Sequence, residues 1–244
     1  MKFAMSDNVG LIKMLDSIDP IESFRPDPDG KCLCGKKLRF ADCCGSSKTD
    51  RALPYGLILK KKFLSDDVAD KLVGYAEKQS TASDLAIFTE SDEGAQESLS
   101  TVVNSDRVTS RIELGDKQSI IDKWIADVFY KLLAKHVGKK IRSFTTPDLM
   151  RYTRGGYYKA HSDADIFDPK MGIWKKVLDR DYSLLLYLNN DFEGGAVRFE
   201  HFNYTYHPEK GDLLIFPSDY LYLHEALLVK SGVRYVIVSW ANIR

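Results

Sequence analysis

His161 and Asp163 are the residues of this sequence best placed for metal chemistry. They lie two positions apart in RYTRGGYYKAHSDAD, residues 151–165, an aromatic segment that reads as a strand. Because residues two apart on a strand point to the same face, both side chains could reach one ion. Two histidines and one carboxylate would leave three coordination positions open, an arrangement typical of non-haem Fe(II) oxygenases. Such a site therefore needs a second histidine.

That second histidine has three candidates later in the chain: His201, His207 and His224. His207 lies beside a proline in a predicted turn and reads as an exposed loop residue. His201 is better explained as a hydrogen-bonded residue of a β-sandwich core than as a ligand. The carboxylate is also open at this point, because Asp165 would replace Asp163 if the register of the strand differed.

The position of Arg234 favours His224 as the second histidine ligand. An oxygenase that chelates iron with a dicarboxylate co-substrate needs a fixed cation for the far carboxylate. Arginine suits this role best because its planar guanidinium can meet a carboxylate in a bidentate way. His224 precedes Arg234 by a short segment, and Arg234 begins the strand-like sequence RYVIVSW.

Helical patterns come first in the chain and strand patterns follow. Ser65 and two aspartates predict the start of one amphipathic helix, and a second is predicted between Asp116 and Gly138. Residues 81–110 show little periodicity and are predicted to form a long loop. Strands are predicted at 148–152, 182–188, 196–202, 212–216 and 234–240. This order favours an α+β fold whose core is an antiparallel sandwich or barrel, which can hold a metal in its mouth.

The motifs HSD, residues 161–163, and HEALLVKSGVRYVIVSW, residues 224–240, together resemble the Fe(II)- and 2-oxoglutarate-dependent dioxygenases. The closest likeness is to the prolyl-4-hydroxylase-like branch, and it extends over residues 55–244. The resemblance implies a double-stranded β-helix, a jelly-roll or cupin-like core with flanking helices. It implies Fe(II), 2-oxoglutarate and O2 as cofactor and co-substrates, with ascorbate as a further candidate. It also implies residue roles: iron ligands His161, Asp163 and His224, and co-substrate contacts Arg234, Tyr187 and Tyr152.

This resemblance implies hydroxylation of a protein or peptide substrate, with prolyl 4-hydroxylation as the leading version. Two alternatives stay open: a small-molecule oxygenase with the same iron site, and a binding module that has lost catalysis. Each tyrosine, taken singly, could be an ordinary strand aromatic. Gly194 and Gly195 fit a family turn, and the segment 166–180 is an insertion that could close over substrate.

All four cysteines lie in KCLCGKKLRFADCCG, residues 31–45: Cys32, Cys34, Cys43 and Cys44. In a reducing compartment such a cluster indicates a metal site, and four thiolates suit a structural Zn(II). The segment resembles the SEC-C motif, although Gly35 runs directly into two lysines where the family usually has a Gly-Ser-Gly turn. We therefore predict an N-terminal segment, residues 1–50, with a zinc motif at 30–45 that could dock to a protein or a ribosome. A pair of disulfides is the alternative.

Composition sets the remaining expectations. The 244 residues are 44% hydrophobic, enough for one domain of moderate size with an appendage. Lysine plus arginine and aspartate plus glutamate both total 35, so no overall field attracts nucleic acid or an anionic membrane. Neither a membrane span nor a signal-peptide core is predicted, which makes the cytoplasm the expected location.

Overall fold

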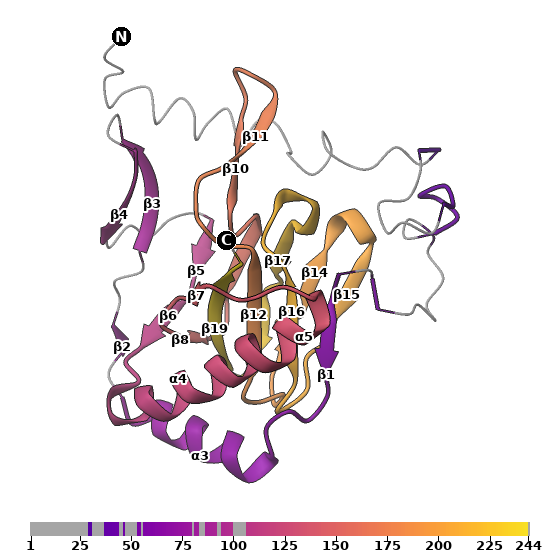
Figure 1. Ribbon diagram of the computed structural model, residues 1–244. Coiled ribbons are helices and arrows are strands. Elements are labelled where there is room, and N and C mark those ends of the chain that lie inside the picture. The colour runs from indigo at the N-terminus through magenta and orange to yellow at the C-terminus, as the bar shows by residue number, and fades with distance from the viewer. Residues whose placement is uncertain are drawn as a thin grey trace.

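The computed structural model describes residues 29–30, 37–43, 46, 53–54, 56–79, 81–82, 86–91, 94–99 and 106–243. Within these residues the fold consists of two antiparallel sheets, short hairpins and a layer of helices (Figure 1). No helix of the described part is long and apolar enough to cross a membrane.

The larger sheet contains eight strands and provides the frame of the molecule. Its order is β1 (Ile58–Lys60), β16 (Leu213–Pro217), β12 (Tyr182–Tyr187), β19 (Arg234–Asn242), β8 (Asp148–Tyr152), β6 (Ser110–Ile112) and β2 (Thr81–Ala82), with β7 (Ser143–Phe144) also paired to β19. The smaller sheet contains five strands: β15 (Tyr204–Tyr206), β14 (Val197–Phe199), β17 (His224–Ala226), β9 (Tyr157–His161) and β5 (Arg107–Val108).

Three two-stranded sheets complete the strands. The hairpin of β10 (Asp165–Asp168) and β11 (Ile173–Lys176) projects beyond the larger sheets at the top of Figure 1. A second hairpin pairs β3 (Ala86–Ser91) with β4 (Gly94–Leu99), and β13 (Glu193–Gly194) pairs with the distant β18 (Val229–Ser231). Short 3-10 turns lie at η1 (Gly115–Lys117), η3 (Glu200–Phe202) and η4 (Tyr220–Tyr222).

The helices cover one face of the larger sheet (Figure 1). Helix α3 (Asp66–Ala76) begins at Ser65, whose side chain accepts a hydrogen bond from the Val68 amide, as its sequence predicts. The second helical segment runs through α4 (Gln118–Asp127), the π-helical turn η2 (Val128–Leu133) and α5 (Ala134–Val137). It ends at Gly138, whose φ of 67° is left-handed.

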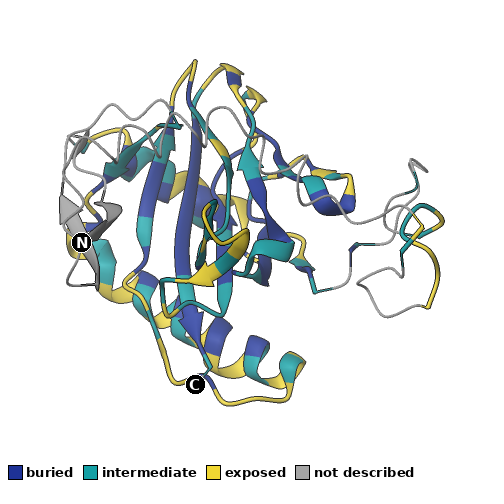
Figure 2. Ribbon diagram, turned by 90° about the horizontal axis from the view of Figure 1, so that it is seen from above, coloured by how far each residue is buried: buried dark blue, intermediate teal, exposed yellow. Residues whose placement is uncertain are grey.

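Alternation along the central strands divides their side chains between two cores. On β19, Tyr235 and Ile237 pack toward the helices, whereas Val236 and Val238 face the smaller sheet. Leu149 and Met150 divide in the same way on β8. Figure 2 shows the central strands buried along most of their length. The side of the larger sheet away from the helices is therefore where a site can be enclosed between the sheets.

The mixed helix-and-strand fold with strand-rich sheets is as predicted, and all five predicted strand segments contain a strand. Two details were wrong. The segment 81–110 is not one long loop, because β2 and β6 extend the larger sheet and β5 joins the smaller one. The predicted strand at 196–202 stops at Phe199 and continues as the turn η3. Short strands of this kind owe their pairing to distant partners, which local periodicity does not report.

Candidate metal and co-substrate site

His161, Asp163 and His224 come together between the two sheets. His161 ends β9, His224 begins β17, and the two residues are paired across these strands. The Asp163 carboxylate lies 3.6 Å from His161 Nε2 through Oδ1 and 3.6 Å from His224 Nε2 through Oδ2. One donor atom from each of the three residues lies within 4.8 Å of the others. This spacing suits three ligands on one face of a metal ion.

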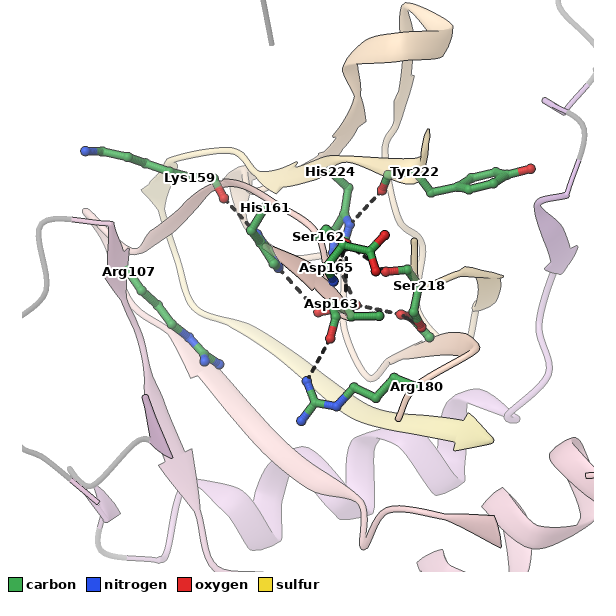
Figure 3. Close-up of polar contacts among 12 residues, drawn as sticks. Arg107, Lys159, His161, Ser162, Asp163, Asp165, Arg180, Ser218, Tyr222 and His224 are labelled. Atoms are coloured by element: carbon green, nitrogen blue, oxygen red, sulfur yellow. Dashed lines mark hydrogen bonds and ion pairs between the residues drawn. The ribbon is translucent and has the colours of Figure 1, made fainter. Parts of the chain in front are cut away.

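Both imidazoles are oriented for metal binding by the backbone (Figure 3). His161 Nδ1 hydrogen-bonds the carbonyl of Lys159 at 2.8 Å, and His224 Nδ1 hydrogen-bonds that of Tyr222 at 3.1 Å. A carbonyl can only accept, so each Nδ1 carries a proton and each Nε2, which faces Asp163, is the nitrogen placed to bind a metal. Burial, with a smaller effect of His161, lowers the pKa of His224 to about 4, so its ring is neutral at pH 7.

Asp163 is held by Ser183, which the sequence did not single out and which in turn contacts Ser218. Ser183 on β12 donates a hydrogen bond of 2.6 Å to Asp163 Oδ2, and its hydroxyl lies 2.8 Å from that of Ser218. Burial by itself would raise the pKa of Asp163, but His224, His161 and Arg180 outweigh it and hold the pKa well below its usual range. The carboxylate is therefore ionised, as a ligand must be.

The other candidate ligands lie elsewhere. His201 is buried in η3, where its Nδ1 lies 3.2 Å from the carbonyl of Leu221, and His207 is exposed. Asp165 Oδ2 accepts a hydrogen bond of 2.8 Å from the Tyr220 amide, so it fixes the chain at η4. Of the alternatives left open by the sequence, the geometry favours Asp163 and His224.

A cavity of about 150 Å³ extends from the three ligands toward Arg234, which is only 3% exposed. The Arg234 guanidinium lies 3.9 Å above the Tyr152 ring, and Nη1 donates to the Gly195 carbonyl at 2.7 Å. Its Nε is buried without a hydrogen-bond partner, and no carboxylate of the described residues pairs with it. A buried guanidinium that lacks a carboxylate partner is suited to bind an anion that enters the cavity.

Tyr187 and Tyr152 also line the cavity and are buried. Burial raises the pKa of Tyr187 far above its usual value, although Arg234 acts in the opposite direction. The hydroxyl of Tyr187 therefore keeps its proton and can donate a hydrogen bond. The structure thus places all three residues expected to contact the co-substrate in one cavity with the three expected metal ligands.

Four further side chains of this cavity were not predicted. The Tyr158 ring stacks on His161 with centroids 3.6 Å apart, and the guanidinium of Arg107 lies 4.6 Å from the Tyr158 ring. Arg180 lies 3.8 Å above the Trp240 ring and donates to the backbone carbonyl of Asp163 at 3.3 Å. Tyr158 belongs to the quoted aromatic segment, but nothing local in the sequence links the two arginines to it.

The insertion at 166–180 forms most of the β10–β11 hairpin beside the site. Trp174 stacks on Tyr220 with centroids 5.6 Å apart, which fixes the hairpin against η4. Ile166, Met171 and Ile173 are exposed on it. The hairpin follows directly from Asp163 and returns to Arg180, so it borders the cavity at both of its ends.

The zinc prediction concerns residues that lie mostly outside the described part of the chain. Cys32, Cys34 and Cys44 are not among the described residues, and Cys43 is half-buried in the turn at residues 40–43. The predicted SEC-C-like zinc motif at 30–45 therefore stays a prediction.

Comparison with known families identifies the part of the chain that carries this site. Residues 147–242 match the 2OG-Fe(II) oxygenase superfamily. This segment is a 2OG-Fe(II) oxygenase domain. Among curated proteins, the domain is similar to the multifunctional procollagen lysine hydroxylase and glycosyltransferase of Caenorhabditis elegans, with 32% identity over 85 residues. That match covers 34% of this chain and 10% of the relative, so the chain spans about a tenth of its length.

Solved structures show the same fold. The viral collagen prolyl hydroxylase of Paramecium Bursaria Chlorella virus-1, in complex with 2OG, has a TM-score of 0.54 at 23% identity, covering 76% of this chain and 95% of that one. A prolyl hydroxylase from Trichoplax adhaerens, in complex with a hypoxia inducible factor oxygen degradation domain peptide fragment, has a TM-score of 0.52 at 19% identity, covering 77% and 84%. At these identities the similarity shows the fold alone.

Proposed function

We propose that this protein is an Fe(II)- and 2-oxoglutarate-dependent dioxygenase that hydroxylates a protein substrate, with prolyl residues as the leading target. One observation carries the proposal. The Nε2 atoms of His161 and His224 and the carboxylate of Asp163 converge in a cavity that is also lined by Arg234, which is buried and has no carboxylate partner among the described residues. In this proposal His161, Asp163 and His224 hold the iron. The two facing antiparallel sheets support a double-stranded β-helix as the core.

The protein would orient the reactants and exclude water from the site. Bound iron with 2-oxoglutarate would activate O2 for hydroxylation and yield succinate and carbon dioxide. Arg234 would grip the far carboxylate of 2-oxoglutarate, and the protonated Tyr187 would donate to the same carboxylate. Tyr152, which lies under the guanidinium, would keep Arg234 in place. Ser183 would keep Asp163 turned toward the metal.

The activities of the relatives support a protein substrate. The structural neighbours are prolyl hydroxylases, one bound to a peptide fragment, and the curated relative is a procollagen lysine hydroxylase. The exposed apolar side chains of the β10–β11 hairpin border the cavity and would suit contact with a polypeptide. We further propose that the Zn(II) motif at residues 30–45 docks the enzyme to a protein or ribosomal partner, and that the protein acts in the cytoplasm.

The metal and co-substrate site can be tested without a substrate. Fe(II) and then 2-oxoglutarate are added to the purified protein under nitrogen, and visible spectra are recorded for the charge-transfer absorption of the chelated complex. The wild type and a His207→Ala control, which changes an exposed histidine outside the cavity, should show the band. His161→Ala should lack it while remaining folded. A folded wild type without the band would refute the oxygenase assignment.

The class of substrate needs a separate measurement. Intact mass spectra of candidate partner proteins are recorded after incubation with the enzyme, Fe(II), 2-oxoglutarate and air. A protein hydroxylase adds one oxygen atom to its partner, and fragmentation locates it on proline or on another residue. Succinate production that leaves every protein unchanged but consumes an added metabolite would favour the small-molecule alternative.

A further inference from the structure

The cavity carries more positive charge than the proposed reaction uses. Four arginines line it (Arg107, Arg111, Arg180 and Arg234), against the two aspartates Asp148 and Asp163. Divalent iron and doubly negative 2-oxoglutarate would cancel each other, so their binding would leave this surplus in place. Arg234 lies at the buried end, and Arg111 is paired with Asp148 at 3.5 Å and with Glu113 at 3.3 Å. Arg180 lies close enough to Asp163 to stabilise its charged form, so the surplus is assigned to Arg107.

Arg107 faces the cavity without a carboxylate of its own. It is paired with Tyr158 across β5 and β9, and its guanidinium lies over the ring that stacks on His161. Its Nη2 contacts only the Met150 sulfur, at 3.9 Å, and its Nε is buried without a hydrogen-bond partner. No ion pair joins Arg107 to an acidic residue of the described part of the chain. The neighbouring Asp106 pairs with Lys159 at 2.8 Å.

Arg180 approaches the same space from a different direction. Figure 3 shows Arg107 and Arg180 reaching below the metal ligands from different directions, each with its guanidinium turned toward the space beside Asp163. Arg180 is held by the Trp240 ring and by the Asp163 carbonyl. Because each guanidinium lies over an aromatic ring, its edges are the parts left to meet a planar anion.

We propose that Arg107 and Arg180 form a subsite for a carboxylate side chain of the protein substrate. This inference rests on the proposed hydroxylase function and adds a specificity: the hydroxylated residue lies close in sequence to an aspartate or glutamate. Arg107 is the specificity-determining residue, since no ion pair joins it to an acidic residue of the described part and, unlike Arg234, it is not assigned to 2-oxoglutarate. Arg180 positions the carboxylate from a different direction.

The test uses amidated peptides that contain one proline with glutamate at a neighbouring position, and matched peptides with glutamine or lysine there. The full-length protein is supplied with Fe(II), 2-oxoglutarate and air, and the gain of one oxygen atom is followed by mass. We expect kcat/KM at least about tenfold higher for glutamate than for glutamine peptides, the factor typical of one charge-assisted hydrogen bond. Peptides with a free C-terminal carboxylate and no acidic side chain distinguish a chain terminus from a side chain.

Variants of Arg107 separate charge from structure. Arg107→Gln should remove the preference for glutamate, Arg107→Lys should retain most of it, and Arg107→Glu should shift the preference to lysine peptides. Arg154→Gln changes an exposed arginine that does not line the cavity, and it should keep the wild-type preference. Raising the salt from about 0.05 to 0.5 M should weaken the preference in the wild type, because it screens the charge interaction.

Succinate released from 2-oxoglutarate in the same mixtures distinguishes failure of this inference from failure of the proposed function. Equal turnover of glutamate and glutamine peptides, or a preference that survives in Arg107→Gln, overturns the carboxylate subsite while the oxygenase stands. Succinate without hydroxylation of any glutamate peptide also overturns it. Absence of succinate in every mixture, from folded and iron-loaded protein, overturns the proposed function itself.

Discussion

Replacement of Arg234 by methionine should abolish tight binding of 2-oxoglutarate without unfolding the protein. Arg234 is 3% exposed, lies over the Tyr152 ring and donates one hydrogen bond to the Gly195 carbonyl. In the complex it would gain a bidentate pair with a carboxylate. Breaking a buried pair of this kind costs about 3–5 kcal/mol. The dissociation constant for 2-oxoglutarate should therefore rise by roughly 10²-fold to a few thousandfold.

The stability of the protein without 2-oxoglutarate should change little. Methionine loses one charge-assisted hydrogen bond, about 1.5–3 kcal/mol, and a desolvated cation–π contact of about 2 kcal/mol. It also removes a buried charge, whose desolvation costs several kcal/mol. These contributions have opposite signs and similar size. We expect the free energy of unfolding of Arg234→Met to lie within about 1 kcal/mol of the wild type.

Thermal unfolding with Mn(II) in place of Fe(II) measures both quantities. At a 2-oxoglutarate concentration of about 100 times the wild-type Kd, ligand binding stabilises the wild type by about 2.7 kcal/mol. For a chain of this length that raises Tm by roughly 5–10 °C. A hundredfold weaker variant at the same concentration should gain only about 1 °C. Equal ligand-induced shifts in both proteins would refute the assignment of Arg234, and Arg154→Met serves as the exposed control.

Three further predictions concern residues around the site and the fold. Ser183→Ala removes the hydrogen bond to Asp163 and should weaken Fe(II) binding about 10- to 100-fold by anaerobic titration. Gly172→Ala, at φ 66° in open space, should lower the free energy of unfolding by roughly 1–2 kcal/mol through backbone strain alone. Gly194→Ala, at φ 76°, would also place Cβ 2.1 Å from a backbone oxygen, so it should cost about 1–3 kcal/mol more. Asp212→Asn should lower Tm by roughly 6–12 °C through the loss of about 3 kcal/mol, and should flatten the fall in stability below about pH 4.

Matched controls make these outcomes decisive. Ser239 is a buried serine on β19 that donates to the Thr145 carbonyl instead of a metal ligand, so Ser239→Ala should leave Fe(II) affinity unchanged. If Ser239→Ala weakened Fe(II) binding as much as Ser183→Ala does, the orienting role of Ser183 would be wrong. Equal losses of Tm in Gly172→Ala and Gly194→Ala would contradict the steric argument at Gly194.

The sign of the pH effect at Asp212 follows from its contacts. Burial alone would raise the pKa of this carboxyl, but the Tyr206 hydroxyl and the Lys61 ammonium outweigh burial and hold the pKa below its usual value. A depressed folded pKa contributes stability that is present above the unfolded pKa of about 3.9 and is lost as pH falls through the folded pKa. A wild type whose stability did not fall on acidification below about pH 4 would contradict this.

The parts of the site that the sequence could predict are those encoded by local spacing. His161 is the last residue of β9 and Asp163 lies in the bend after it, so the prediction that both stand on one strand was wrong, although the short spacing still brings them together. Arg234 begins β19, and the requirement for a cation was enough to nominate it. The choice between Asp163 and Asp165 depended instead on where β9 ends. Only the structure shows that Asp165 is engaged by the Tyr220 amide.

The parts that could not be predicted are set by contacts between distant segments. Ser183 hydrogen-bonds Asp163, which is twenty residues earlier in the sequence. Arg107 contacts Tyr158, which is fifty-one residues later, and belongs to β5, a strand of only two residues. Residues 81–110 carry no pattern that reveals β2, β5 or β6, because each of these short strands is defined by the strand beside it. Arg107 was therefore hidden inside a segment that looked like a loop.

Strand β19 explains why one cavity can serve both the co-substrate and the substrate. Arg234, Val236, Val238 and Trp240 alternate along it and all line the cavity, so the strand separates its two ends by about 20 Å. Arg234 is buried at one end, while Trp240 and Arg180 are only half-buried at the other. The central position of β19, paired with both β12 and β8, makes this separation rigid. If the proposed function is correct and a polypeptide binds at the half-buried end, it would block the way to Arg234, so we predict that 2-oxoglutarate binds before the substrate.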